Sequence, residues 1–233
     1  MRERRTLVMV PGLMCDEDLF AAQRTALVED GFDVVVPRLS GPRSIGEMAQ
    51  AVLTAAPDRF CLLGLSMGGY VALEVLRRAA ERVEALALLD TSARPDSPEQ
   101  TSHRRDLVRT AQDRGLEPVL EQLWPLEVAP SHVDDAGLRT RFDAMGHHLG
   151  VDVFARQQEA IIGRADSRLR LPAVTVPTLV LCGRQDALTP VEVHEEMAAA
   201  VGGAQLVVLE DCGHLSTWEQ PDAVTAHLRH WLG

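Results

Sequence analysis

The sequence predicts an α/β protein built on a mostly parallel β-sheet with helices on both faces. Short apolar runs of strand type alternate with longer stretches of helical spacing, which is the pattern of repeated βαβ units. These runs are apolar almost throughout, as expected for strands that are covered on both sides. The alternation stops once, from about residue 95 to residue 171, where only helical spacing is found.

The alternating part contains six predicted strands. In chain order they are Thr6–Val10, Phe32–Pro37, Phe60–Leu63, Ala85–Leu89, Thr178–Cys182 and Gln205–Leu209. Helices are predicted at Asp18–Asp30, Ser44–Ala55, Met67–Ala80, Pro190–Val201 and Pro221–Leu232. Gly31 is placed to end the first helix as its C′ glycine. Ser44 and Glu47 have the spacing of a capping box at the start of the second.

The interruption predicts an inserted helical unit. Leu116, Val119, Leu120, Leu123 and Trp124 fall at helical spacing, and further apolar positions continue it, so we expect about four helices here. The sequence therefore divides into a core of residues 1–95 and 171–233 and an insertion of residues 96–170.

The chemical signal is the turn Gly64-Leu65-Ser66-Met67-Gly68, which lies between a predicted strand and a predicted helix. A turn this sharp forces a positive φ at the serine and favours glycine two residues to either side. Ser66 is therefore the candidate nucleophile.

A serine hydroxyl needs a base and a carboxylate that orients the base. Asp186 follows one later strand and His214 follows the next, in the order Ser, Asp, His. The carboxyl ends of parallel strands meet at one edge of a sheet, so we expect the three side chains to lie together. Asp90 also ends a strand and is the competing acid, with a structural role as its alternative.

Two backbone amides should bind the oxyanion that forms during acyl transfer. One is that of Met67, at the amino end of a helix, where the dipole favours negative charge. The other should come from the loop that follows the first strand, where Leu13 is the first choice and Met14 its rival.

Composition restricts the partners. The net charge of −11 argues against nucleic acid, and no apolar run approaches the eighteen residues of a membrane span. Four widely spaced cysteines show no metal or redox spacing, which favours a reducing, cytoplasmic setting with free thiols. We expect a monomer or homodimer that acts on a small molecule, with no metal and no organic cofactor.

These residues resemble the α/β-hydrolase superfamily over nearly the whole chain, in particular its small bacterial-type, esterase-like members. The resemblance rests on the turn around Ser66, on Gly183-Arg184-Gln185-Asp186 with its trailing Pro190, and on the run from Gly213-His214 to Pro221. It implies a sheet of about six to seven strands, because the amino-terminal strands of larger members are missing. It also implies that the insertion forms a helical cap over the serine.

The chain departs from the family pattern at the oxyanion loop, where Pro11-Gly12 replaces the frequent His-Gly pair. A serine nucleophile also argues against the dehalogenase and epoxide hydrolase branches, which attack through a carboxylate. The expected function is hydrolysis of a carboxylic ester through an acyl-enzyme. Thioesterase, lactonase, carbon–carbon bond hydrolase and perhydrolase activities on the same triad stay open, as does a ligand receptor with an idle triad.

Overall fold

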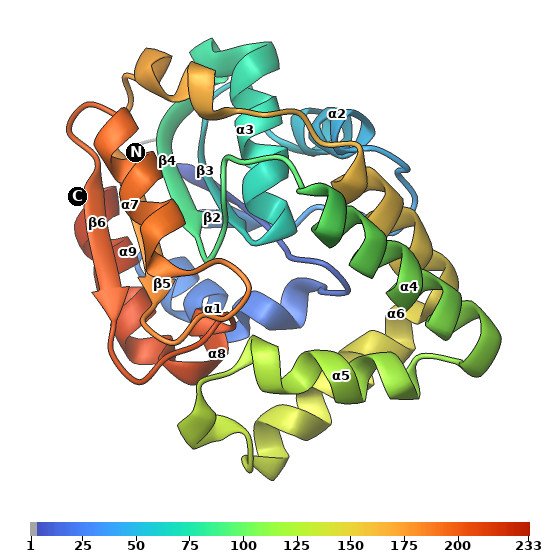
Figure 1. The fold of residues 1–233 in the computed structure, drawn as a ribbon. Helices are drawn as coiled ribbons and strands as arrows, with labels where there is room; N and C mark the ends of the chain where they lie inside the picture. Colours follow the sequence, from blue (N-terminus) through green and yellow to red (C-terminus); the bar gives the residue numbers. More distant parts are fainter. Residues whose placement is uncertain (1–3) are drawn as a thin grey trace.

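The computed structural model describes residues 4–233, so residues 1–3 of the predicted 1–95 segment lie outside it. Its strands form a single parallel sheet in the order β2-β1-β3-β4-β5-β6 (Figure 1). Their bounds are β1 (Thr6–Val10), β2 (Asp33–Val35), β3 (Phe60–Leu65), β4 (Val83–Leu89), β5 (Thr178–Gly183) and β6 (Gln205–Leu209). The predicted fold class, with six parallel strands, is confirmed.

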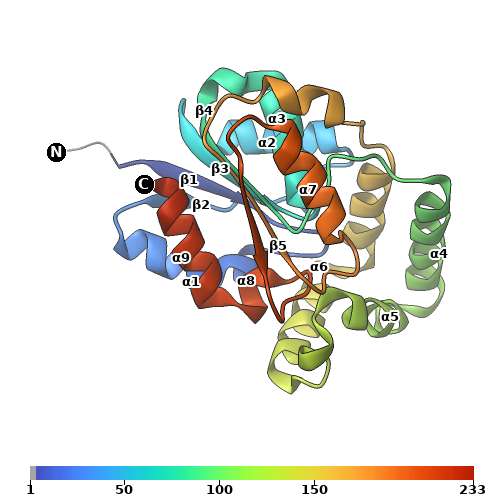
Figure 2. The ribbon, with the colours of Figure 1, turned by 60° about the vertical axis from the view of Figure 1, so that its left-hand side comes forward.

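Helices cover both faces of the sheet. They are α1 (Ala21–Glu29), α2 (Ile45–Ala55), α3 (Met67–Ala79), α7 (Val191–Ala200), α8 (Ser216–Glu219) and α9 (Pro221–Leu232). Side chains alternate along β1, so that Leu7 and Met9 join one apolar cluster and Val8 and Val10 join the other. The first cluster includes residues of α1 and α9, the second those of α2, α3 and α7. Figure 2 shows α1 and α9 on the opposite side of the strands from α2 and α3.

The predicted helix ends follow the local chemistry with one difference. Gly31 follows α1 with φ 95°, as expected of a C′ glycine. The Ser44 hydroxyl accepts the amide of Glu47 at 3.1 Å, which caps α2. The Glu47 carboxylate, however, accepts the amide of Arg43 at 2.7 Å, one residue before the cap, so only half of the capping box forms.

Between β4 and β5 the chain is helical, as predicted. It forms α4 (Pro98–Arg114), α5 (Glu117–Glu127) and α6 (Ala136–Ile162), together with the 3-10 turns Pro130–His132 and Arg168–Ala173. Gly150, with φ 81° and ψ 170°, interrupts the helical backbone within α6. These helices lie together at one side of the molecule (Figure 1). Most of their buried apolar residues join the same cluster as α1 and α9, whereas Ala160 and Ile161 at the end of α6 join the other.

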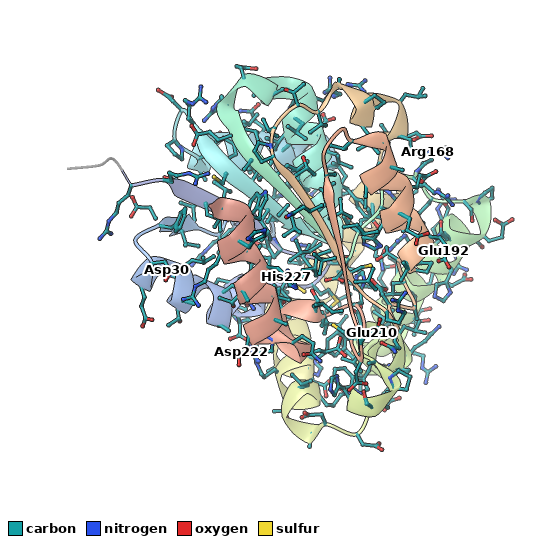
Figure 3. All side chains as sticks on the ribbon, turned by 90° about the vertical axis from the view of Figure 1, so that its left-hand side faces the viewer. Asp30, Arg168, Glu192, Glu210, Asp222 and His227 are labelled. Carbon is teal, nitrogen blue, oxygen red and sulfur yellow. The ribbon has the colours of Figure 1, made fainter. Side chains whose placement is uncertain are left out.

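Charged side chains surround the sheet on the side of α9 and β6, where Asp30, Glu210 and Asp222 lie at the periphery (Figure 3). Asp30 and Glu210 pair there with Arg229 and Arg184 at 2.6 and 2.7 Å. Within residues 4–233, no helix is both long enough and apolar enough to cross a membrane.

Candidate active site

The turn after β3 holds Ser66 in a backbone conformation that residues other than glycine rarely adopt, with φ 54° and ψ −117°. A Cβ atom on Gly64 would lie 2.2 Å from the carbonyl oxygen of Gly68, and one on Gly68 would lie 2.0 Å from that of Val10. Atoms cannot approach so closely, so both positions require glycine. Strain of this kind is typical of functional sites.

Thr91, just after β4, supports the strained turn. Its hydroxyl donates a hydrogen bond of 2.7 Å to the carbonyl oxygen of Ser66, and the amide of Ser66 donates to the carbonyl oxygen of Leu89 at 3.0 Å. The amide of Thr91 in turn donates to Nε2 of the buried His194 at 2.9 Å. The turn after β3, the loop after β4 and helix α7 are therefore linked by hydrogen bonds.

Asp186 and His214 form a buried pair at the carboxyl ends of β5 and β6. His214 Nδ1 lies 2.8 Å from Asp186 Oδ2, and the two residues are 2% and 4% exposed. Asp186 Oδ1 also accepts the amides of Leu188 and Thr189 at 2.9 and 2.8 Å, and Oδ2 accepts the Thr189 hydroxyl at 2.7 Å. The sequence predicted this pairing of acid and histidine.

The surroundings favour the charged form of both partners. Burial raises the pKa of Asp186, but the charge of His214 and the hydrogen bonds from His214 and Thr189 outweigh burial, so the net shift is downward. Burial lowers the pKa of His214, but the charge of Asp186 and its hydrogen bond, with smaller contributions from Glu127 and Asp90, raise it well above its ordinary value. In the neutral imidazole, Asp186 thus favours Nδ1–H as the donor and leaves Nε2 as the candidate base.

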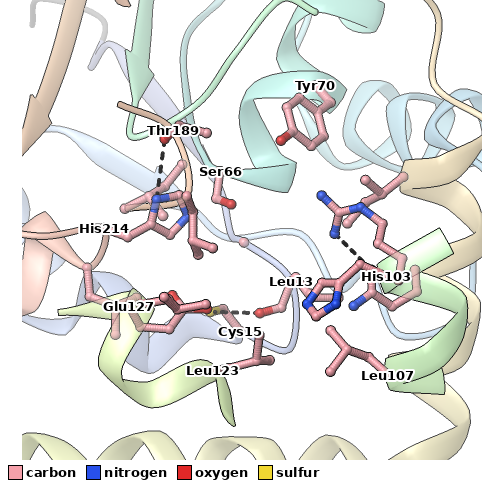
Figure 4. A pocket seen from close by; sticks show the side chains of 18 residues that line it. Leu13, Cys15, Ser66, Tyr70, His103, Leu107, Leu123, Glu127, Thr189 and His214 are labelled. Carbon is pink, nitrogen blue, oxygen red and sulfur yellow. Dashed lines mark hydrogen bonds between the residues drawn. The ribbon is translucent and has the colours of Figure 1, made fainter. Parts of the chain in front are cut away.

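Ser66 and His214 line the same cavity, which has a volume of about 170 Å³ and is also lined by eight leucine and isoleucine residues (Figure 4). Among the described residues no hydrogen bond joins the Ser66 hydroxyl to His214. Contacts between nucleophile and base are often long before a substrate binds. The fold therefore brings all three predicted residues to one sheet edge.

The loop after β1 distinguishes between the two candidate oxyanion donors. The amide of Met14, which has φ 54°, donates a 2.8 Å hydrogen bond to Oε1 of the buried Gln157 on α6. This amide therefore already has an acceptor. Leu13 lines the cavity, and its amide has no hydrogen-bond partner within residues 4–233. Met67 begins α3, where amides lack an acceptor within the helix.

Asp90, the competing acid, is fully buried with φ 46° but makes no hydrogen bond to His214 among the described residues. It accepts the amide of Gly183 at 3.2 Å and the hydroxyl of Ser216. Burial and the charge of Asp186 raise its pKa well above the ordinary value. Asp90 therefore connects the end of β4 with the end of β5 and with the start of α8.

Sequence reasoning missed Glu127, at the end of α5. Its backbone carbonyl accepts the amides of His214 and Leu215, each at 3.0 Å, and the residue lines the cavity. Burial raises the pKa of the Glu127 carboxyl to about 7, although the charge of His214 acts in the opposite direction. No local pattern marks this residue, because its role depends on where α5 ends in space.

Glu219 was also missed. Its buried carboxylate accepts the amides of Gly213 at 2.9 Å and Ala129 at 2.7 Å, and lies 2.8 Å from His132 Nδ1. It thereby joins the histidine loop to the chain that follows α5. Its place in the run from Gly213 to Pro221 was the one available signal.

Comparison with known proteins agrees with this architecture. The sequence model described as "Alpha/beta hydrolase family" matches residues 7–227. A 2-hydroxy-6-oxononadienedioate/2-hydroxy-6-oxononatrienedioate hydrolase of Pseudomonas sp is 27% identical over 213 residues, covering 87% of this chain and 74% of its own.

Two solved structures have nearly the same fold. A thermophilic esterase from Thermogutta terrifontis superposes with a TM-score of 0.89 at 33% identity, over 98% of this chain and 89% of its own. The enol-lactonase from Burkholderia xenovorans LB400 superposes with a TM-score of 0.88 at 26% identity, over 99% of this chain and 92% of its own. The chain belongs to the α/β hydrolase family, and it is a hydrolase.

Proposed function

We propose that this protein hydrolyses carboxylic esters through a covalent acyl-enzyme on Ser66. The observation that carries the proposal is the buried Asp186–His214 pair, which shares a cavity with a serine on a strained turn. The 33% identity to an esterase over almost the whole chain supports it.

The first half of the reaction would acylate the serine. Ser66 Oγ attacks the ester carbonyl carbon while His214 Nε2 takes the hydroxyl proton, and the amides of Leu13 and Met67 hold the oxyanion. The bond between the carbonyl carbon and the alcohol oxygen then breaks. His214 gives its proton to that oxygen, so a neutral alcohol leaves and the acyl group stays on Ser66.

Water completes the cycle. His214 takes a proton from a water molecule whose oxygen attacks the acyl carbon, and the second oxyanion binds to the same two amides. Collapse of this intermediate releases the carboxylic acid and returns the proton to Ser66 Oγ. Asp186 holds the imidazole in the required tautomer and stabilises its charged form in both halves.

The helices α4 to α6 would act as a cap in this scheme. The cavity walls include Leu107 from α4, Leu123 from α5 and Ile161 from α6, so the insertion encloses the serine with apolar surface. Exclusion of water strengthens the electrostatic contacts of the transition state. The small cavity favours substrates with a short apolar chain.

Lactone opening is the second candidate, favoured by the similarity to an enol-lactonase. A lactone is an internal ester, so the steps are the same except that the alcohol stays attached to the acyl group. The two activities would use the same residues and differ in the shape of the substrate.

A panel of p-nitrophenyl esters, from acetate to octanoate, together with simple lactones, tests the proposal. Ser66→Ala should lower kcat by about a thousandfold or more, and mass spectrometry of quenched wild type should find the acyl group on Ser66. Ser102→Ala, on an exposed residue of α4, is the matched control. Equal rates for wild type and Ser66→Ala would reject the mechanism, and binding without turnover would favour a receptor.

A further inference from the structure

Gln158 on α6 is a fully buried residue with an unpartnered donor at the cavity that contains Ser66 and His214. Its Oε1 accepts a 2.9 Å hydrogen bond from Arg104 Nη1. A guanidinium can only donate, so this contact determines which end of the amide faces Arg104. The amide nitrogen Nε2 is left without a partner within residues 4–233.

A buried donor without an acceptor is costly, and such groups in native proteins call for an explanation. The amide cannot relieve the cost by turning over, because its nitrogen would then face another donor. A ligand atom that accepts a hydrogen bond from Nε2 would satisfy it.

The charges beside Gln158 indicate the kind of acceptor. Asp96 is the shared partner of two arginines, with Arg104 Nε 2.7 Å from Oδ2 and Arg164 Nη1 2.5 Å from Oδ1. The side chains of Asp96 and Arg164 are only 1% and 6% exposed, so solvent screens the cluster weakly. Among residues 4–233, neither Arg104 nor Arg164 forms an ion pair with any carboxylate other than Asp96. Two guanidiniums and one carboxylate therefore leave a net positive charge.

The two sides of the cavity differ in charge. Figure 4 shows Glu127 and His214 on one side of Ser66, and Tyr70 and His103 on the other. His103 precedes Arg104 on α4 and lines the cavity with it, while Arg164 lies over the Tyr70 ring at 4.3 Å. An acidic side chain thus stands near the candidate base, and an excess positive charge stands across the cavity.

We propose that Gln158 and Arg104 form a subsite for a carboxylate on the substrate, separated from the reacting carbonyl by a short apolar segment. Gln158 Nε2 donates to one carboxylate oxygen, and the arginine cluster supplies the opposing charge. The proposal rests on the proposed function for the position of the ester at Ser66. It gives the substrate class as small esters that carry a carboxylate at the end remote from the scissile bond.

The test compares matched pairs of esters. The monomethyl esters of succinate, glutarate and adipate carry the carboxylate on the acyl part, and the methyl esters of butyrate, valerate and hexanoate are neutral counterparts. The acetate ester of a short hydroxy acid places the carboxylate on the alcohol part. With the carboxylate on one of these two parts, acyl or alcohol, wild type should give a higher kcat/KM than with the neutral counterpart.

Gln158→Glu keeps an oxygen for Arg104 but removes the donor and adds a negative charge. It should reduce the ratio of charged to neutral kcat/KM by roughly tenfold to a hundredfold, chiefly through KM. Gln158→Met removes the amide with little change in size and should reduce the same ratio. Gln112→Glu, on the exposed face of α4, should leave the ratio unchanged.

A binding measurement separates this inference from the proposed function. Glutarate should raise the Tm of Ser66→Ala, and the additional change Gln158→Glu should abolish the increase, whether or not any ester is hydrolysed. Ester turnover with the same charged-to-neutral ratio in wild type and both Gln158 variants, and no Tm shift with glutarate, would overturn the subsite while leaving the esterase intact. Folding of each variant is checked by its circular dichroism and its Tm without ligand.

Discussion

Gln157 Oε1 accepts a hydrogen bond from the amide of Met14 over 2.8 Å, joining two residues that lie 143 positions apart. The Gln157 amide nitrogen also donates to the carbonyl oxygen of Leu39 at 3.3 Å. Helix α6 thereby holds the loop that carries the Leu13 amide, at a point where Met14 adopts a positive φ. Gln157 is thus a positioning residue for the oxyanion site in the proposed mechanism.

Gln157→Leu should lower kcat by about tenfold to a hundredfold with little change in KM, because the oxyanion donor acts on the transition state. The buried Met14 amide would lose its acceptor, which costs about 1–3 kcal/mol of stability. Ester kinetics and urea unfolding measure the two effects. Gln112→Leu is the exposed control, and a loss of stability without a loss of kcat would contradict the positioning role.

Glu127→Gln should move the ascending limb of kcat/KM to lower pH. The reaction needs neutral His214, and Glu127 is one of the carboxyl groups that raise the pKa of this histidine. Removing that negative charge lowers the pKa of His214, so the base is free at a lower pH. The measurement is a pH profile beside that of Glu121→Gln, an exposed change on the same helix. An unshifted limb would rule out this coupling.

Acid should destabilise the protein through His194. The ring is fully buried, accepts the Thr91 amide at Nε2 and contacts the Pro190 carbonyl oxygen through Nδ1 at 3.2 Å. Burial lowers its pKa to about 4, below an unfolded value of about 6.5. The unfolded chain then binds the proton more tightly, so this contribution is complete above about pH 6.5 and is lost as the pH falls towards about 4.

His194→Gln retains an acceptor for Thr91 but does not titrate. Between about pH 7.5 and 5 the wild type should lose about 2 kcal/mol of unfolding free energy relative to this variant. Urea unfolding of both proteins across this range measures the difference. If the unfolding free energies of the two proteins changed with pH in parallel, His194 would be protonated equally in the folded and unfolded states.

Gly213→Ala should destabilise the fold by about 3 kcal/mol and lower activity, because the new Cβ would lie 2.4 Å from the carbonyl carbon of Val128. The histidine loop would have to move away from the chain that follows α5. Gly202→Ala is the matched change, since no atom lies within 4 Å of its Cβ. Its unfolding free energy should stay within about half a kcal/mol of wild type. Equal stability of the two variants would refute the packing argument.

The sequence was sufficient to predict the sheet because each strand is a short apolar run between clear turn residues. The placement of Ser66, Asp186 and His214 followed from the rule that parallel strands end at one edge. The contacts of Glu127, Gln157 and Gln158 could not be predicted, since they depend on how the helices pack against segments that are distant in sequence. A glutamine on an amphipathic helix has the same local pattern whether it faces solvent or a buried amide.

Gln157 and Gln158 are adjacent on α6, yet the first contacts the loop after β1 and the second lines the cavity that contains Ser66. A lateral shift of α6 would therefore disturb selectivity and turnover at the same time. In laboratory evolution, early substitutions that repack α6 to accept new substrates should therefore also change the turnover rate. Substitutions that widen the acceptance of substrates would need compensating changes beneath Met14 to keep the rate.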